Sequence, residues 1–416
     1  MKKLIMSITI LLFCLCLLTY NFYNDSSIDD TSIHNIKPQN MLSIMLESSD
    51  GSGNYVMTTQ NSWPTDGYVF NSELSKCENG GTLSWDKTNK MVKFSGNISD
   101  KCYVYFDVDT SMSLAEYVVS QYTGTQGVNG IYYHDANLTN GAGDNSYRYA
   151  GTNPNNYVCF GSDDATCPTE NLYRIIGVID GKIKLISADG ATTTMLGTDE
   201  GYVKTYQAAF GSDSSYYKGN GDLTKIGTYK WNKSGTNTWS TSTTNTTNLN
   251  TNYLTYLDSK NTKWKTMIDD TTWYVGGMTY TNGFYSNAKK AYNYEVGLNK
   301  DATTTVTSKI GLMYVSEYYY GATPDYWTLP GYNSSGNDYS KAVNDNWLYT
   351  GLYECTISRR SDASVSEFVV LGSGSVGDDD VGNSLGNVLR PSFSLSSSIK
   401  FTSGEGTAVN PIRIKL

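Results

Sequence analysis

Residues 172–186 have the sequence LYRIIGVIDGKIKLI, in which two apolar runs flank Asp180-Gly181. An Asp-Gly pair is typical of a two-residue turn, because both of its residues adopt positive φ angles at low cost, as a type I′ turn requires. The runs on either side are rich in Ile and Val, which favour strands. The sequence therefore predicts a β-hairpin formed by 172–179 and 182–186.

Short strand-like segments recur on both sides of this hairpin. Those before it are 54–57, 67–70, 81–85, 90–94 and 101–106, and those after it are 273–275, 310–315, 367–371 and 392–395. Helices are predicted from Ser113, where Ser113-Leu114-Ala115-Glu116 matches a capping box, and over 248–258. The expected fold class is therefore mainly β with a few helices, an α+β protein.

The N-terminus carries an export signal or a membrane anchor. Leu4 to Tyr20 is apolar and uncharged and follows Lys2-Lys3, which is the order found in both kinds of segment. No small residues stand where a signal peptidase would need them, so we expect an uncleaved anchor helix with the two lysines inside. The protein is then exported and held in the cell membrane with its bulk outside, or secreted if the segment is cleaved.

We divide the chain into five parts by composition. These are a signal or anchor segment over 1–20, a tether over 21–40, a small disulfide-stapled β-module over 41–110, a helix with a Gly/Asn-rich connector over 111–170, and a larger α+β domain over 171–416.

Charge and residue usage narrow the range of partners. The chain has 31 Lys plus Arg against 40 Asp plus Glu, a net charge of −9, which argues against nucleic acid as a partner. Its 35 Tyr, together with many Ser, Gly and Asn, are typical of adaptable recognition surfaces. The same composition also suits strands and turns, so it leaves both interpretations open.

Five of the seven cysteines follow the apolar segment. In an oxidising compartment the nearest partners pair most readily, which predicts disulfides Cys77–Cys102 and Cys159–Cys167 and leaves Cys355 unpaired. No close Cys or His spacing indicates a metal site, and we assign no metal or cofactor.

Few residues suggest catalysis. His34 and His134 are the only histidines, which argues against a histidine triad, and His134 is interpreted as an ordinary residue at a strand end. Asp378-Asp379-Asp380 is interpreted as a solvated turn rather than a calcium loop, because the alternating ligand spacing is missing. We assign no catalytic residue.

Several motifs resemble those of known proteins. HDANLTNG (134–141), DNSYRY (144–149), NPNNYVCFG (153–161) and NLYRIIG (171–177) resemble uncharacterised exported proteins of gut Firmicutes, some of which have prepilin-like N-termini. This chain lacks the prepilin signature Gly-Phe-Thr-Leu-x-Glu. Segments 249–254, KIGLMYVSEY (309–318), NWL (346–348) and VLRPSF (388–393) are similar to a domain of unknown function related to C-type-lectin-like folds. The resemblance implies a C-type-lectin-like domain over 171–416. The apolar character of Trp347, Phe368, Val370 and Phe393 predicts that they lie in its core.

The expected function is recognition rather than catalysis. We expect a membrane-anchored extracellular binding protein whose ligand is a glycan, a peptide or a host protein, and the alternatives are a structural subunit of a surface appendage or an extracellular carbohydrate-active hydrolase. If 318–320 is a half-exposed strand, its adjacent side chains point to opposite faces. We therefore predict a contact surface with partly exposed aromatic rings at Tyr318, Tyr319, Tyr320, Tyr326 and Trp327.

Overall fold

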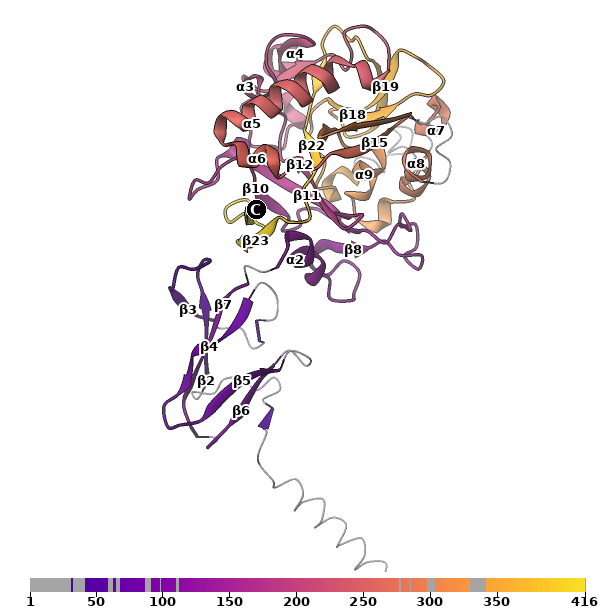
Figure 1. Cartoon of the computed structure of the whole chain (residues 1–416). Helices are drawn as coiled ribbons and strands as arrows, with labels where there is room; N and C mark the ends of the chain where they lie inside the picture. Colours follow the sequence, from indigo (N-terminus) through magenta and orange to yellow (C-terminus); the bar gives the residue numbers. More distant parts are fainter. Residues whose placement is uncertain are drawn as a thin grey trace, which may run out of the picture. The chain divides into compact units, whose positions relative to one another are not determined.

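The computed structural model describes residues 31–32, 42–58, 63–64, 68–86, 91–97, 99–109, 112–276, 278–284, 286–297, 304–329 and 342–415. The chain forms two compact units, Met1–Asp109 and Thr110–Leu416, and in both of them strands predominate (Figure 1). The predicted mainly β class is confirmed. The expected anchor over 1–20 lies outside the described residues, and no helix within them is both long and apolar enough to cross a membrane.

The first unit contains two sheets that share one core. A four-stranded sheet has the order β3 (Tyr55–Met57), β2 (Leu42–Glu47), β7 (Cys102–Val108), β4 (Tyr68–Cys77), and a three-stranded sheet has the order β1 (Thr31–Ser32), β6 (Met91–Ser95), β5 (Thr82–Asp86). Alternate residues of β7 are buried, as the two-residue period of a strand requires. Val104 and Phe106 of β7 form the core with Ile44 and Val92, so both sheets contribute to it.

The main sheet of the second unit is built around the predicted hairpin. Its strands follow the order β17 (Ile310–Gly311), β22 (Ser392–Ser394), β12 (Lys182–Ser187), β11 (Leu172–Ile179), β9 (Tyr147–Tyr149), β8 (Ile131–Tyr133), and β10 (Tyr157–Cys159) also pairs with β11. Ile179 pairs with Lys182, and Asp180 and Gly181 have φ angles of 50° and 74°, so the hairpin is confirmed. The segment expected to be a connector over 111–170 instead supplies β8, β9 and β10 to this sheet.

A second sheet lies in the same unit. Its order is β13 (Tyr202–Thr205), β14 (Gly227–Tyr229), β21 (Asn387–Val388), β18 (Glu354–Arg359), β19 (Ser366–Val370), β20 (Val376–Asp380), and two further pairs are β15 (Thr271–Val275) with β16 (Thr304–Ser308) and β23 (Lys400–Ser403) with β24 (Arg413–Lys415). The solvated turn predicted at 378–380 is wrong, because these residues pair with β19 as the end of β20. Asp378 forms an ion pair with Arg360, and Asp379 accepts a hydrogen bond from the Asn387 side chain.

The helices are short. The α-helices are α2 (Leu114–Ser120), α3 (Thr193–Leu196), α4 (Tyr206–Phe210), α5 (Leu254–Lys260), α6 (Thr262–Thr266), α7 (Tyr280–Phe284), α8 (Ala288–Glu295) and α9 (Val315–Tyr320). Short 3-10 helices are η1 (Val128–Gly130), η2 (Thr169–Asn171), η3 (Gly211–Tyr216), η4 (Trp239–Thr241), η6 (Pro324–Tyr326) and η7 (Val343–Asp345). The capping box at Ser113 is confirmed. The helix predicted over 248–258 begins earlier, as a π-helical segment η5 (Thr244–Tyr253) that continues into α5.

The predicted core residues and cysteines lie in the environments expected of them. Trp347, Phe368, Val370 and Phe393 are all buried, as expected of core residues. Cys355 is buried and has no disulfide partner, as predicted. Both predicted disulfides are confirmed, with Cα–Cα separations of 4.0 Å for Cys77–Cys102 and 5.8 Å for Cys159–Cys167.

Candidate ligand-binding site

A cleft of about 490 Å³ opens in the second unit, and we call it the charged cleft. Its size is within the range of small-molecule sites. The residues that line it come from segments far apart in the sequence: Asp144 and Arg148 around β9, Ile179, Asp180, Lys182 and Lys184 on the β11–β12 hairpin, Asp270 to Tyr274 around β15, Tyr292 and Val296 around α8, Tyr314, Ser316 and Glu317 around the start of α9, and Ser394 on β22.

The first feature of the charged cleft is a buried ion pair on β9. Arg148, whose side chain is 4% exposed, donates from Nη2 to Asp144 at 2.7 Å and from Nε to the Ser146 hydroxyl at 2.8 Å. Burial alone would raise the pKa of Asp144, but the Arg148 guanidinium and the hydrogen bonds from Ser146 hold it well below its usual range. The Nη1 group of Arg148 has no acceptor among the described residues, so its N–H groups are available to a ligand.

The second feature is another buried ion pair, between β12 and α9. Lys184 donates to Glu317 at 2.6 Å, and the two side chains are 7% and 4% exposed. The Lys184 ammonium also lies 4.8 Å from the ring centre of Trp273 and 4.6 Å from that of Tyr314, within cation–π distance. Burial lowers the pKa of Lys184, and the neighbouring Glu317 opposes this shift. Only one of the three ammonium N–H groups has an acceptor among the described residues.

Aromatic side chains form much of the rest of the wall. Trp273, Tyr274, Tyr292 and Tyr314 line the charged cleft. Two of them are fixed by hydrogen bonds, since Trp273 donates its indole N–H to the Ser308 carbonyl at 3.1 Å and the Tyr314 hydroxyl accepts the Tyr274 backbone N–H at 3.0 Å. The cleft thus combines flat apolar area with directional polar groups.

A buried carboxyl group positions the start of α9. Glu295, the last residue of α8, accepts the backbone N–H groups of Val315 and Ser316, each at 3.0 Å, and the hydroxyl of Ser358. Burial raises the pKa of Glu295 to about 7. Glu295 does not line the charged cleft, so its role is to hold α8 against the helix that carries Glu317.

The predicted aromatic contact surface is wrong for four of its five residues. Tyr318, Tyr319, Tyr320 and Trp327 are at most 1% exposed, and Tyr326 is half-buried. Residues 318–320 belong to α9 rather than to a half-exposed strand, and this helix is enclosed on every side. The Tyr318 hydroxyl donates to the Gly374 carbonyl, and the Trp327 indole donates to the Ala322 carbonyl.

The residues of the charged cleft were not singled out from the sequence. One signal was present, because Lys184 interrupts an apolar strand between Ile183 and Leu185. A lysine on a strand that is otherwise buried needs a partner of opposite charge. The sequence does not show that this partner is Glu317, more than a hundred positions later.

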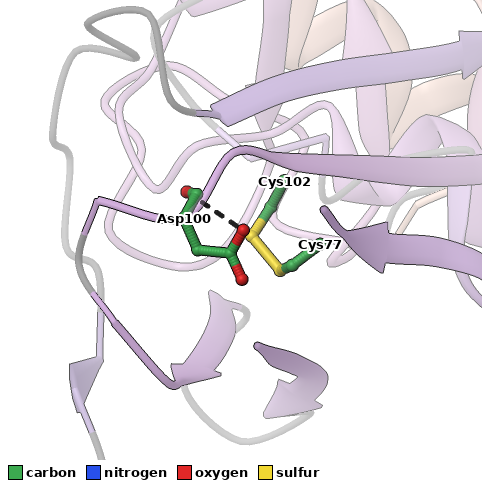
Figure 2. Close-up of side chains that lie close together, drawn as sticks. All are labelled: Cys77, Asp100 and Cys102. Carbon is green, nitrogen blue, oxygen red and sulfur yellow. Dashed lines mark hydrogen bonds between the residues drawn. A yellow bond between two sulfur atoms is a disulfide. The ribbon is translucent and has the colours of Figure 1, made fainter. Parts of the chain in front are cut away.

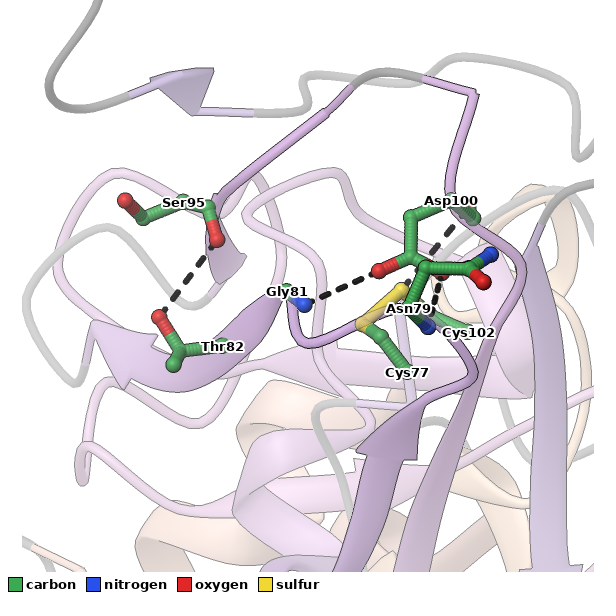
Figure 3. Close-up of a disulfide and its surroundings, with 7 residues drawn as sticks. All are labelled: Cys77, Asn79, Gly81, Thr82, Ser95, Asp100 and Cys102. Atoms are coloured by element: carbon green, nitrogen blue, oxygen red, sulfur yellow. Dashed lines mark hydrogen bonds between the residues drawn. A yellow bond between two sulfur atoms is a disulfide. The ribbon is translucent and has the colours of Figure 1, made fainter.

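A cluster of two sulfurs and one carboxylate in the first unit superficially resembles a metal site (Figure 2). The ligand atoms of Cys77, Asp100 and Cys102 lie within 4.8 Å of one another. The two sulfurs are bonded to each other, so neither is the thiolate that a metal requires. The Asp100 carboxylate accepts the backbone N–H groups of Asn79 at 2.8 Å and Gly81 at 2.9 Å (Figure 3). Desolvation alone would raise the pKa of Asp100, but these hydrogen bonds lower it. The same bonds fix the loop over 79–81.

The chain was also compared with known proteins. No known protein family, curated protein or solved structure matches it.

Proposed function

We propose that this chain is an exported, membrane-anchored binding protein whose second unit binds a saccharide in the charged cleft. The observation that carries the proposal is the pair of buried ion pairs, Arg148–Asp144 and Lys184–Glu317, whose cations keep unused N–H groups beside aromatic rings.

The ion pairs are better explained by binding than by stability. Taking two charges out of water costs free energy that their attraction only partly offsets, so well-packed apolar residues would serve the fold as well or better. Ion pairs retained at a cleft instead provide fixed donors and acceptors. Two such pairs contribute to the lining of one cleft, which favours a role toward a ligand.

A saccharide suits this combination of groups. A sugar hydroxyl accepts a hydrogen bond from Arg148 or Lys184 and donates one to a neighbouring carboxylate, and the carbon-bound hydrogens of a sugar ring pack on an aromatic face. The lining residues carry charges of both signs, with Asp180, Asp270 and Lys182 beside the two pairs, so the cleft is not selective for one strong charge. This composition supports a polyhydroxylated ligand.

The cellular location is supported by two independent features. The apolar segment over 4–20 follows two lysines, and each unit contains a disulfide, which forms in oxidising compartments. The C-type-lectin-like assignment of 171–416 belongs to the same proposal and depends on the sequence resemblance.

A hydrolase is a weaker interpretation of the charged cleft. A glycosidase needs a carboxylic acid with a raised pKa beside its substrate. Among the described residues, burial raises the pKa of three carboxyl groups, Glu295, Glu354 and Glu367. None of the three lines this cleft. A structural appendage subunit, the other alternative, would not require ligand-facing N–H groups.

The test is a glycan array followed by calorimetry, both with the full chain in detergent. We expect binding of at least one saccharide, weakened by roughly 10-fold to 100-fold in Lys184→Met/Glu317→Leu, because a hydrogen bond to a charged group contributes about 1.5–3 kcal/mol. The double substitution removes both charges and leaves neither buried alone. It also removes the Glu317 acceptor of the Tyr314 backbone N–H, so circular dichroism checks that the variant is folded.

Lys233→Gln is the matched control. It also breaks a lysine–glutamate pair, with Glu200 at 2.9 Å, but both side chains are exposed and outside the cleft. Absence of any saccharide ligand, or equal affinity of the double variant and the unsubstituted chain, would overturn the proposal.

A further inference from the structure

A second cleft of about 400 Å³ lies elsewhere in the second unit, and we call it the amide cleft. Its lining includes the amide side chains of Gln121, Asn129, Asn153 and Asn155 and the rings of Tyr117 and Tyr149. The sole ionisable carboxylate or basic side chain among its lining residues is Glu405. The amide cleft therefore differs from the charged cleft in chemistry as well as in place.

The two clefts use neighbouring residues of one strand. Arg148 lines the charged cleft and Tyr149 lines the amide cleft, and both belong to β9. Adjacent side chains of a strand point to opposite faces of the sheet. The amide cleft is therefore a separate site, and a ligand in it does not contact the two ion pairs.

One residue that lines the amide cleft has an unsatisfied hydroxyl. Tyr149 is 4% exposed, and its hydroxyl has no hydrogen-bond partner among the described residues. The hydroxyl oxygen is nevertheless not completely enclosed by protein. Buried tyrosine hydroxyls usually find a partner. Because Tyr149 lines the amide cleft, a ligand bound there can supply the missing partner.

The amide groups around this hydroxyl also keep unused hydrogen-bonding capacity. Asn153 accepts from Arg174 through Oδ1 at 3.1 Å, and Asn129 donates through Nδ2 to the Gln121 carbonyl at 2.9 Å. The Asn153 NH₂ group and the Asn129 Oδ1 atom have no protein partner among the described residues. The cleft thus presents amide donors and amide acceptors together.

We propose that the amide cleft is a second saccharide-binding site, selective for neutral sugars that carry an acetamido group. The acetamido N–H and C=O match side-chain amides, each of which offers both a donor and an acceptor. The Tyr117 ring, stacked on Phe401 with centroids 3.8 Å apart, is held firmly at the wall and offers apolar area to the acetamido methyl. A single carboxylate and no cation in the lining disfavour acidic sugars.

A peptide has the same amide chemistry but fits this place less well. Extended peptides usually bind by adding a strand to an open sheet edge. Strand β9 already pairs with β11 on one side and β8 on the other. The backbone groups of β9 are therefore not open for a peptide strand to pair with.

The experiment measures binding of N,N′,N″-triacetylchitotriose to the full chain in detergent by calorimetry. It is done in the Lys184→Met/Glu317→Leu background, in which binding in the charged cleft is weakened while the amide cleft is unchanged. We expect saturable binding, and 2-fold to 10-fold weaker binding in Tyr149→Phe, which removes only the hydroxyl. The matched control is Tyr256→Phe, which removes the hydroxyl of a buried tyrosine on α5, away from both clefts.

Two further probes identify the group that is recognised. Cellotriose has the same linkage without acetamido groups, and we expect it to bind at least 10-fold more weakly. Trialanine tests the peptide alternative. The proposal is overturned if triacetylchitotriose does not bind, if Tyr149→Phe binds it as well as its parent, or if cellotriose or trialanine binds equally well. None of these results bears on the saccharide proposed for the charged cleft.

Discussion

His134 is a fully buried histidine with only one satisfied ring nitrogen. Its Nδ1 accepts the Ala142 backbone N–H at 3.1 Å, so Nε2 carries the proton, and Nε2 has no partner among the described residues. The ring packs against Tyr320 and Trp327. The interpretation as a residue at a strand end is correct, since β8 ends at Tyr133, but the burial was not foreseen. Burial and the nearby Arg148 lower the pKa of His134 to about 3, and Asp144 opposes them.

This histidine should make the second unit sensitive to mild acid. The unfolded chain binds a proton on His134 below its ordinary pKa of about 6.5, and the folded chain does not until about pH 3. The unfolded state then holds more protons between these values, so the contribution of His134 to stability falls as the pH drops through this window. The slope reaches about 1.4 kcal/mol per pH unit.

The test compares His134→Gln with the unsubstituted chain by urea unfolding between pH 6.5 and 5. Glu295, Glu354 and Glu367 act in the opposite direction, because burial raises the pKa of each in the folded state, which then binds more protons than the unfolded state. The variant should therefore gain stability relative to the unsubstituted chain by roughly 1 kcal/mol per unit as the pH falls. His34→Gln, which changes the chain's other histidine, should show no such gain in stability. Parallel stability curves for His134→Gln and the unsubstituted chain would contradict the assignment.

At the scale of elements, the start of α2 is fixed by a local motif. The Ser113 hydroxyl accepts the Glu116 N–H at 3.1 Å, and the Glu116 carboxylate accepts the Ser113 N–H at 2.8 Å. The hydrogen bonds from Ser113 also lower the pKa of Glu116. Ser113→Ala should reduce the free energy of unfolding of the second unit by about 1 kcal/mol, as for other N-cap residues.

Chemical denaturation of Ser113→Ala checks this value. Ser120→Ala is the control at the other end of α2, where the hydroxyl donates to the Tyr117 carbonyl at 2.7 Å and accepts the Gln121 side-chain amide, but caps no backbone N–H group. Its effect should be clearly smaller. Equal losses for the two variants would show that the capping box adds nothing beyond an ordinary serine hydroxyl.

The elements that the sequence predicted well are those with local signals. Asp180-Gly181 permits a turn with two positive φ angles, and Ser113 with Glu116 satisfies a helix start, whatever lies further away. The run Tyr318-Tyr319-Tyr320 carries no such signal, since three adjacent tyrosines suit a half-exposed strand as well as a helix. Their burial depends on neighbours such as Gly374 and Asn140, which accept hydrogen bonds from Tyr318 and Tyr320.

The candidate site was harder to predict for the same reason. Arg148, Lys184, Trp273 and Glu317 meet only when the β11–β12 hairpin, β15 and α9 are in place. No spacing in the sequence relates them. Of these four residues, only Lys184 gave a signal in the sequence, as a charge within an apolar strand. Its partner Glu317 comes near it only in the tertiary structure.

At the scale of the whole molecule, the two units differ in how much core they can bury. The described part of the first unit is small, with a core centred on Ile44, Val92, Val104 and Phe106. Domains of this size are marginally stable without a covalent staple. The Cys77–Cys102 disulfide closes a loop with a sequence separation of 25, which corresponds to about 3 kcal/mol in the chain-entropy model.

Removal of this disulfide should therefore affect the first unit alone. In Cys77→Ala/Cys102→Ala we expect a loss of about 3 kcal/mol in the first unit, because the unfolded chain there regains its loop entropy. The second unit keeps its own core and the Cys159–Cys167 bridge, so its unfolding should not change. Hydrogen exchange measured by mass spectrometry distinguishes unfolding of the two units. Peptides from β4 and β7 report on the first unit, and peptides from β11 and β12 report on the second. Faster exchange in all four strands together would mean that the units unfold as one, and the division at Asp109 would then have no thermodynamic counterpart.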